Sequence, residues 1–173
     1  MVVISDISEL PRMPAVYALY GGEGKSRYVA YVGIATKLKQ RIKQHLVRRS
    51  SSVVAGKDAT MLNPEFVTEI NWWEYPKFTE QDDLEAAELV AFDVLQPALR
   101  SRGAVTARAQ ALYDDAGFSD ATRKLFAGSP AGKLVLPTLP EAIRRIVALE
   151  RRIVALETQL AERSTRQTDH AAS

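Results

Sequence analysis

The first 88 residues of the chain contain five side chains whose types and spacing would suit hydrolysis of a phosphodiester bond. They are Tyr17, Tyr31, Arg41, His45 and Glu88. Arg41 follows Tyr31 by ten residues, and His45 follows Arg41 by four, which is about one turn of a helix. Hydrolysis needs a base for the attacking water, a cation near the scissile phosphate and usually a divalent metal ion. Hydroxyl, guanidinium, imidazole and carboxylate groups can supply these parts together.

Glu88 is the candidate metal ligand because of its position on a predicted helix. On a helical wheel it lies between Leu84 and Leu95 on one side and Phe92 on the other. A carboxylate on this apolar face costs free energy unless something pairs with it. Carboxylates are natural ligands of magnesium or manganese. A buried salt bridge to Arg41 or another base would explain the same placement, so the residues alone leave both interpretations open.

Arg41 and His45 are expected on one stripe of a single helix. The guanidinium can hold a phosphate in a bidentate grip and stabilise the charge that develops on it. The imidazole, from one of only two histidines in the chain, can assist as a base or donate a hydrogen bond to the phosphate. The alternatives are a solvated arginine and a surface histidine.

The tyrosines belong to a predicted β-hairpin. Segments 15–20 and 28–32 are rich in β-branched and aromatic residues and flank a glycine-rich turn. An antiparallel register with Tyr17 opposite Tyr31 would place both on one face of the sheet and pair Tyr20 with Tyr28 on the other. Residues 66–75 predict a third strand.

Two helices are expected to hold the remaining candidates. Residues 36–49 carry an apolar residue at every fourth position from Leu38, with Thr36 as the N-cap. A second helix runs from about residue 80 to 95, and Pro97 ends it. The expected fold class is therefore α+β: a small, mainly antiparallel three-stranded sheet flanked by helices, followed by a helical extension and a coiled coil.

The ordered set of motifs resembles the GIY-YIG nuclease family over residues 12–102. The two name motifs correspond to Ala15-Val16-Tyr17 and Tyr31-Val32-Gly33. The resemblance implies that Tyr17 accepts the proton of the attacking water and that Tyr31 orients the phosphate or the water. It also matches the family's arginine and histidine to Arg41 and His45, and its metal-binding glutamate to Glu88. The implied activity is a DNA endonuclease that depends on Mg²⁺, or on Mn²⁺ in its place.

Two positions depart from the family's pattern. Ala15 replaces the first glycine of the name motif, which ordinary β backbone tolerates. Arg100, three residues after Pro97, stands where the family commonly has asparagine. This second change predicts altered or lost catalysis, and it motivates a rival function as a DNA-binding module that no longer cleaves. A second rival is a scaffold whose coiled coil is its purpose.

Charge is distributed unevenly, although the formal net charge is only +2. Residues 1–50 hold nine Lys/Arg and three Asp/Glu, a balance of +6, whereas residues 58–93 hold ten acids and one base. The basic end suits a polyanionic partner such as DNA. The side chains expected to contact phosphates without sequence specificity are Lys37, Lys39, Lys43, Arg48 and Arg49. Of the adjacent Trp72 and Trp73, one is expected in the core and the other can stack on a base.

The sequence after residue 102 indicates self-association of the protein and shows no candidate catalytic residues. Residues 103–137 read as a helical spacer with two short helices. Residues 138–164 contain a heptad that repeats residue for residue at 144–150 and 151–157, with isoleucine at position a and leucine at position d. This pattern favours a parallel coiled-coil homodimer. The polar residues 165–173 are expected to be disordered.

The amino-acid composition excludes several classes of protein and site. The chain has no cysteine, which excludes disulfides and thiolate chemistry and favours a reducing cytoplasm. It has no run of about 18 apolar residues that could cross a membrane, and its first ten residues do not resemble a signal peptide.

Overall fold

The computed structural model describes residues 1–22, 24–55, 62–100 and 103–171. It divides into two compact units, Met1–Leu136 and Pro137–Ser173. The first contains a sheet with helices and all the candidate site residues, and the second consists of one long helix.

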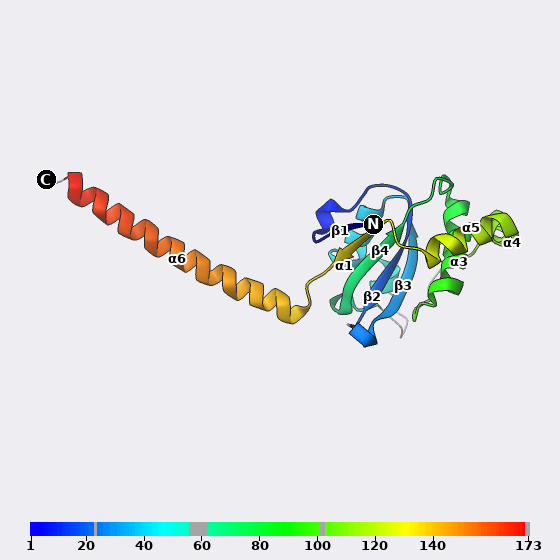
Figure 1. Cartoon of the computed structure of the whole chain (residues 1–173), viewed down its shortest axis with the longest axis horizontal. Helices are drawn as coiled ribbons and strands as arrows, with labels where there is room; N and C mark the ends of the chain where they lie inside the picture. The colour runs from blue at the N-terminus through cyan, green and yellow to red at the C-terminus, as the bar shows by residue number, and fades with distance from the viewer. Residues whose placement is uncertain (23, 56–61, 101–102, 172–173) are drawn as a thin grey trace. The chain divides into compact units, whose positions relative to one another are not determined.

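The sheet has five strands in the order β1-β5-β4-β2-β3 (Figure 1). The α+β class is confirmed, but the expected three-stranded sheet is wrong. The three predicted strands form one antiparallel half as β2 (Ala15–Gly21), β3 (Tyr28–Ala35) and β4 (Val67–Trp73). The two further strands are β1 (Val2–Ile4) and β5 (Gly132–Val135), which pair in parallel with each other while β5 pairs antiparallel with β4. At three and four residues, both are too short to show a clear alternation of apolar and polar side chains.

Strand β2 lies between β4 and β3, and its alternate side chains enter two separate apolar cores. Tyr17 and Leu19 lie in one core with residues of α1 (Leu38–Leu46), and Val16 and Ala18 lie in the other with residues of α3 (Gln81–Leu95). Every residue of β2 is buried. The two faces explain how the fold brings α1 and α3 to opposite sides of one hairpin.

Helix α1 is shorter than predicted, and its cap differs. It begins after Lys37, which makes no side-chain cap bond, so Thr36 is not the N-cap. Its end is followed by Arg49, whose φ of 50° turns the chain toward the short helix α2 (Ser52–Ala55). The apolar stripe is confirmed by Leu38 and Ile42, both fully buried.

Helix α3 closely follows its prediction. Glu80 and Asp83 form a reciprocal capping box at its start. Gln96 ends it in the left-handed conformation, with φ of 47°. This ending directly precedes Pro97, which cannot continue a helix.

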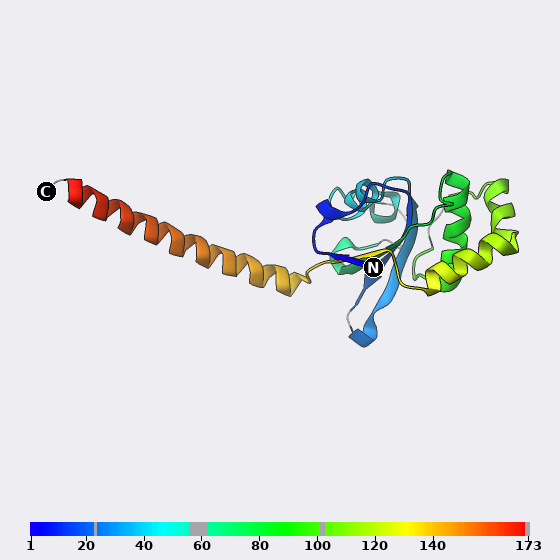
Figure 2. The ribbon, with the colours of Figure 1, turned by 45° about the horizontal axis from the view of Figure 1, so that its top comes forward.

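The region expected to be a spacer is part of the first unit. Helices α4 (Ala107–Asp114) and α5 (Ala116–Ala127) pack against α3 and against each other, as Figures 1 and 2 show. Their sequence predicted the two helices, but not that β5 follows them as a strand of the sheet. Short 3-10 turns at Ile7–Glu9, Gly24–Ser26 and Pro64–Phe66 complete the elements.

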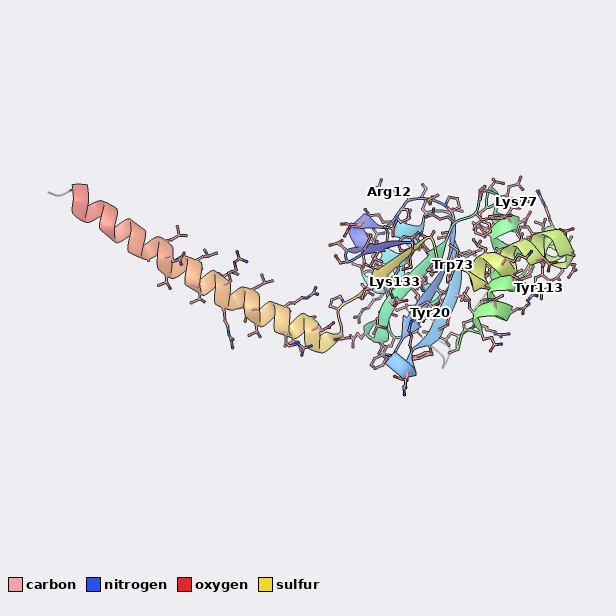
Figure 3. All side chains as sticks on the ribbon, in the orientation of Figure 1. Arg12, Tyr20, Trp73, Lys77, Tyr113 and Lys133 are labelled. Carbon is pink, nitrogen blue, oxygen red and sulfur yellow. The ribbon has the colours of Figure 1, made fainter. Side chains whose placement is uncertain are left out.

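Both tryptophans are buried, so the one whose place the sequence left open is also in the core. Trp72 and Trp73 are 3% and 2% exposed. Trp72 lies against Gly132, where any Cβ would come within 1.9 Å of the indole ring. Trp73, labelled in Figure 3, packs edge-on against Phe126 of α5 with ring centroids 5.5 Å apart. Both sides of β4 are therefore covered at this point.

A buried carboxylate at Glu69 of β4 has a structural explanation. Its oxygens lie 2.6 Å from Arg27 and 2.6 Å from Lys133. Burial would raise its pKa, but hydrogen bonds from Lys133 and Arg27 lower the pKa overall. The Arg27 guanidinium also lies 3.8 Å from the centroid of the Tyr20 ring. These contacts connect three strands and leave Glu69 outside the candidate site.

The second unit is helix α6 (Leu139–Ala171). It includes residues 165–171, for which the sequence predicted disorder, while residues 172–173 lie outside the described part. The apolar heptad positions from Ile146 to Leu160 are half exposed or more. No described helix is long and apolar enough to cross a membrane.

Candidate active site

A cleft of about 450 Å³ lies at the outer edge of β3, the last strand of the sheet. Tyr31 of β3, Arg41 of α1 and Glu88 of α3 all line it. Its other walls come from the residues Ile34, Ser52, Val53, Gln81, Glu85 and 103–105. A neighbouring hollow of about 370 Å³ shares Ile34, Gln81 and Arg41 and extends over the start of α1 past Lys37. Three of the five sequence-predicted residues therefore meet in one open space.

Tyr17 and His45 lie behind this cleft and do not line it. Both side chains are fully buried. The Tyr17 hydroxyl lies 2.6 Å from His45 Nε2, and His45 Nδ1 lies 2.7 Å from the Ser51 hydroxyl. With Nε2 accepting the tyrosine proton, Nδ1 carries the other hydrogen and donates it to Ser51. The sequence pointed to the tyrosine and histidine but gave no reason to expect that they would touch.

The two tyrosines share a face in a register different from the expected one. Tyr17 pairs with Gly33, and Tyr31 pairs with Leu19, so the expected pairing of Tyr17 with Tyr31 is wrong by two residues. A β-bulge at Leu19/Tyr20 then places Tyr20 opposite Val29. The diagonal arrangement still brings the Tyr17 and Tyr31 ring centroids to 6.2 Å.

Gly33 makes this arrangement possible. A Cβ at this position would lie 2.6 Å from the Tyr17 hydroxyl oxygen and 2.8 Å from the Tyr31 ring. Only hydrogen fits there without moving a ring. The glycine is inside β3 and does not end the strand, as its place in the sequence suggested.

Arg41 connects the buried tyrosine to the cleft. Its guanidinium donates to Gln44 at 3.3 Å and interacts with the hydroxyls of Tyr17 and Tyr31. Burial raises the pKa of Tyr17 well above its ordinary value, Tyr31 raises it further, and Arg41 opposes both. The pKa of Tyr31 is also raised, by burial and then by Glu88. Both phenols therefore keep their protons at neutral pH.

His45 is held neutral. Burial, and then the charge of Arg41, lower its pKa to about 4. A neutral imidazole can accept a proton at Nε2, which an imidazolium cannot do. The site thus keeps an acceptor next to a protonated tyrosine.

Glu88 and Glu85 are the carboxylates that could hold a metal ion. Glu88 is 8% exposed and Glu85 is half-buried one helical turn away, and both face the cleft. One Glu85 oxygen accepts from Gln81 at 3.1 Å, and the other is buried with no hydrogen-bond partner in the described part of the chain. Magnesium is usually bound through one or two carboxylates and keeps several waters. Two carboxylates on an open polar cleft fit this requirement.

Within residues 1–22, 24–55, 62–100 and 103–171, no group of three metal-ligating side chains gathers in one place. Ser51, Gln81 and Glu85 are site residues that the sequence analysis missed. The spacing of Glu85 and Glu88 on one helix was the only available signal, because three residues bring side chains to the same helix face.

Arg100 lies outside the cleft. Its guanidinium points to the end of α3, 3.4 Å from the carbonyl oxygen of Phe92. It lines a separate hollow with Asp93 and Tyr113. Arg100 therefore does not line the cleft that contains Glu88.

The predicted DNA-binding cations are spread along α1 and its exit. Lys37, Arg48 and Arg49 are exposed, and Lys39 and Lys43 are half-buried. Two are already engaged: Lys39 donates to the carbonyl oxygen of Ser8, and Arg49 lies 3.2 Å from Glu65. Lys37 is the one that borders the hollow next to Arg41.

The low pKa of His45 predicts acid sensitivity of the fold. The unfolded chain binds a proton at His45 near pH 6.5, and the folded chain does so only near pH 4. Stability from this residue is therefore complete above pH 6.5 and is lost as the pH falls toward 4, by about 3 kcal/mol. Urea unfolding at pH 7, 5.5 and 4 should show a steeper fall for the natural chain than for His45→Gln. Parallel pH profiles for the two proteins would contradict the buried neutral state of His45.

Comparison of the chain with models of known protein families, with curated proteins and with solved structures finds no match. A function can therefore be inferred only from the site residues and their geometry.

Proposed function

We propose that the first unit is a metal-dependent endonuclease that hydrolyses phosphodiester bonds in DNA, with a GIY-YIG-like site. The observation that carries the proposal is the meeting of Tyr31, Arg41 and Glu88 in one open cleft, directly in front of the Tyr17–His45 hydrogen bond. Cation, carboxylate and proton acceptor are the parts that this hydrolysis requires. The basic surface along α1 supplies attraction for the polyanion.

The phosphate is held by Arg41, whose guanidinium stabilises charge on its oxygens. Tyr31 at the cleft wall orients the phosphate or the attacking water. Glu88, with Glu85 beside it, would hold Mg²⁺ or Mn²⁺, which supplies positive charge to the phosphate and lowers the pKa of bound water.

Proton transfer involves Tyr17 and His45 together. Because the pKa of Tyr17 lies well above its ordinary value, its hydroxyl serves as a base only if its own proton leaves at the same time. His45 Nε2, at 2.6 Å, can take that proton as the proton of water reaches Tyr17. In the tautomer in which Nδ1 donates to the Ser51 hydroxyl, Nε2 is the ring nitrogen that accepts.

The direct test is nicking of supercoiled plasmid by the full chain, with and without magnesium. We expect relaxed circles with magnesium or manganese and none with a chelator. The variant Arg41→Lys retains the charge but loses the planar bidentate donor. It should therefore nick far more slowly than the natural chain. An inactive natural chain that still binds DNA in a salt-dependent way would favour the DNA-binding module instead.

A second function, as an assembly element, is favoured by α6. Its heptad positions Ile146, Leu149, Ile153, Leu156 and Leu160 are 50–65% exposed. An apolar stripe repeated every seven residues, with isoleucine at a and leucine at d, suits a parallel two-stranded coiled coil. Arg145 and Arg152 at position g would face Glu150 and Glu157 of a second copy. Each such exposed pair contributes only about 0.3–0.5 kcal/mol, so the apolar stripe must provide most of the stability.

The full chain should therefore be a dimer at tens of micromolar, with twice its 19.1 kDa mass by light scattering. Ile153→Lys at position a should give the monomer mass. Val154→Lys, on an equally exposed neighbour outside the stripe, should remain dimeric. A natural chain that scatters as a monomer under these conditions would refute the coiled-coil assignment.

A further inference from the structure

A separate, apolar pocket lies beside β3 and shares no lining residue with the catalytic cleft. It has a volume of about 290 Å³ and is lined by the residues Tyr28, Ala30, Leu62, Asn63, Phe66, Val67, Ala98 and Leu99. Pockets that hold small ligands begin at about 300 Å³. At about 290 Å³ the pocket lies at the lower end of this range, which suits one flat ring system rather than a larger ligand.

Two aromatic side chains that line the pocket are exposed to solvent. Phe66 is 66% exposed and Tyr28 is 49% exposed. Water-facing rings at an apolar pocket cost free energy unless a partner covers them. The Tyr28 ring also has a defined position, because it lies across Gly21, where a Cβ would come within 2.8 Å of it.

The wall of the pocket adjoins the exit of α1. Arg49 lies 3.2 Å from Glu65, the residue next to Phe66, and this ion pair joins the exit to the aromatic wall. Arg48 is exposed at the same exit. Positive charge beside an exposed aromatic ring is the combination that binds unpaired nucleotides, in which the backbone meets the cation and the base stacks on the ring.

The pocket is connected to the catalytic cleft through two backbone contacts. Tyr31 lines the cleft and its neighbour Ala30 lines the pocket, and Leu99 bridges to Tyr31 beside them. On the other side, the Leu62 amide donates to the carbonyl oxygen of Val53, joining one wall of the pocket to one wall of the cleft. A strand held at Arg41 therefore has a stacking surface close by.

We propose that this pocket binds an unpaired base of a DNA strand whose phosphate lies in the catalytic cleft. The substrate class is then DNA with an unpaired or extrahelical nucleotide near the cleavage point, rather than uninterrupted duplex. This inference rests on the proposed nuclease function and adds its substrate preference.

The test measures affinity, so that it does not depend on cleavage. Fluorescence anisotropy, in chelator, compares the full chain on a thymine-containing single strand and on an abasic strand of the same length and charge. We expect about ten-fold tighter binding to the strand with bases, a difference of about 1.4 kcal/mol and within the range for base stacking on aromatic rings.

Phe66→Leu should abolish that preference while leaving affinity for the abasic strand unchanged. Val47→Ala is the matched control, since Val47 is 62% exposed at the same helix exit but does not line the pocket, and it should keep the preference. Phe66→Trp should report base contact directly by fluorescence quenching with the first strand only.

Equal binding of the two strands by the natural chain, or an equal loss of both with Phe66→Leu, would overturn the inference. Plasmid nicking shows whether the base-binding inference or the proposed nuclease function has failed. Nicking without a base preference refutes the pocket alone, and a base preference without nicking refutes the nuclease alone.

Discussion

Glu88→Gln should abolish magnesium-dependent nicking, by roughly 10³-fold, while DNA binding in chelator stays near that of the natural chain. The substitution keeps the size and hydrogen bonding of the side chain and removes the charge that would hold a divalent ion. The assay is plasmid nicking across a magnesium titration, beside anisotropy on one duplex.

The melting curve of the same variant separates the two interpretations of Glu88. If the carboxylate serves a metal, removal of a charge that is 8% exposed should hold or raise the melting temperature without metal. If it serves only as the partner of a buried base, its loss should cost about 3–5 kcal/mol. Glu85→Gln, one turn away on the same cleft wall, is the matched control and should reduce activity less. A large loss of stability together with unchanged nicking would refute the metal assignment.

The sequence predicted the parts of the fold that have a long, regular pattern. The 15 residues of α3 repeat apolar positions over four turns and end before a proline, and the structure places them within one residue of the expected bounds. Strands β2, β3 and β4 were found for the same reason. The strands β1 and β5 were missed because β1 pairs only with β5, from the opposite end of the first unit, while β5 pairs with β1 and with β4.

The sequence predicted the residue types of the site, but not which of them are buried or which hydrogen bonds join them. Spacing put Arg41 and His45 on one helix stripe, yet only the packing of α1 on the sheet buries His45 completely and leaves Arg41 at the cleft. The Ser51 contact depends on a turn after α1 that no periodic pattern signals. Arg100 was a candidate site residue because it lies three positions after Pro97. Its guanidinium instead contacts the carbonyl oxygen of Phe92 near the end of α3.

The register of the hairpin shows why a single pairing assumption failed. The pairing of Tyr17 with Gly33 shifts this part of the hairpin by two residues from the expected arrangement, and beyond the β-bulge at Leu19/Tyr20 the shift is one residue. A shift of two keeps a side chain on its own face, because side chains alternate with a period of two. Tyr17 and Tyr31 therefore still meet, although their partners were wrongly predicted.

Tyr17→Phe should lower the nicking rate by about 10²–10⁴-fold, the range for loss of a positioned acid or base. It removes one oxygen, whose neighbour at 2.6 Å is His45 Nε2. Because that nitrogen is then buried without its partner, stability should also fall by about 1–3 kcal/mol. Tyr20→Phe is the matched control: Tyr20 lies on the same strand, equally part of a core but on the opposite face, and its loss of a hydroxyl should leave nicking unchanged.

A double variant tests whether the tyrosine and histidine act as one unit. If the proton passes from water to Tyr17 as the tyrosine proton passes to His45, removal of either partner stops the same transfer. Tyr17→Phe combined with His45→Gln should then nick no more slowly than Tyr17→Phe alone, because residues that work as a unit are strongly non-additive. Rate losses that multiply in the double variant would show independent roles. Wild-type nicking by Tyr17→Phe would exclude Tyr17 from proton transfer and leave the cleft residue Tyr31 as the candidate tyrosine for catalysis.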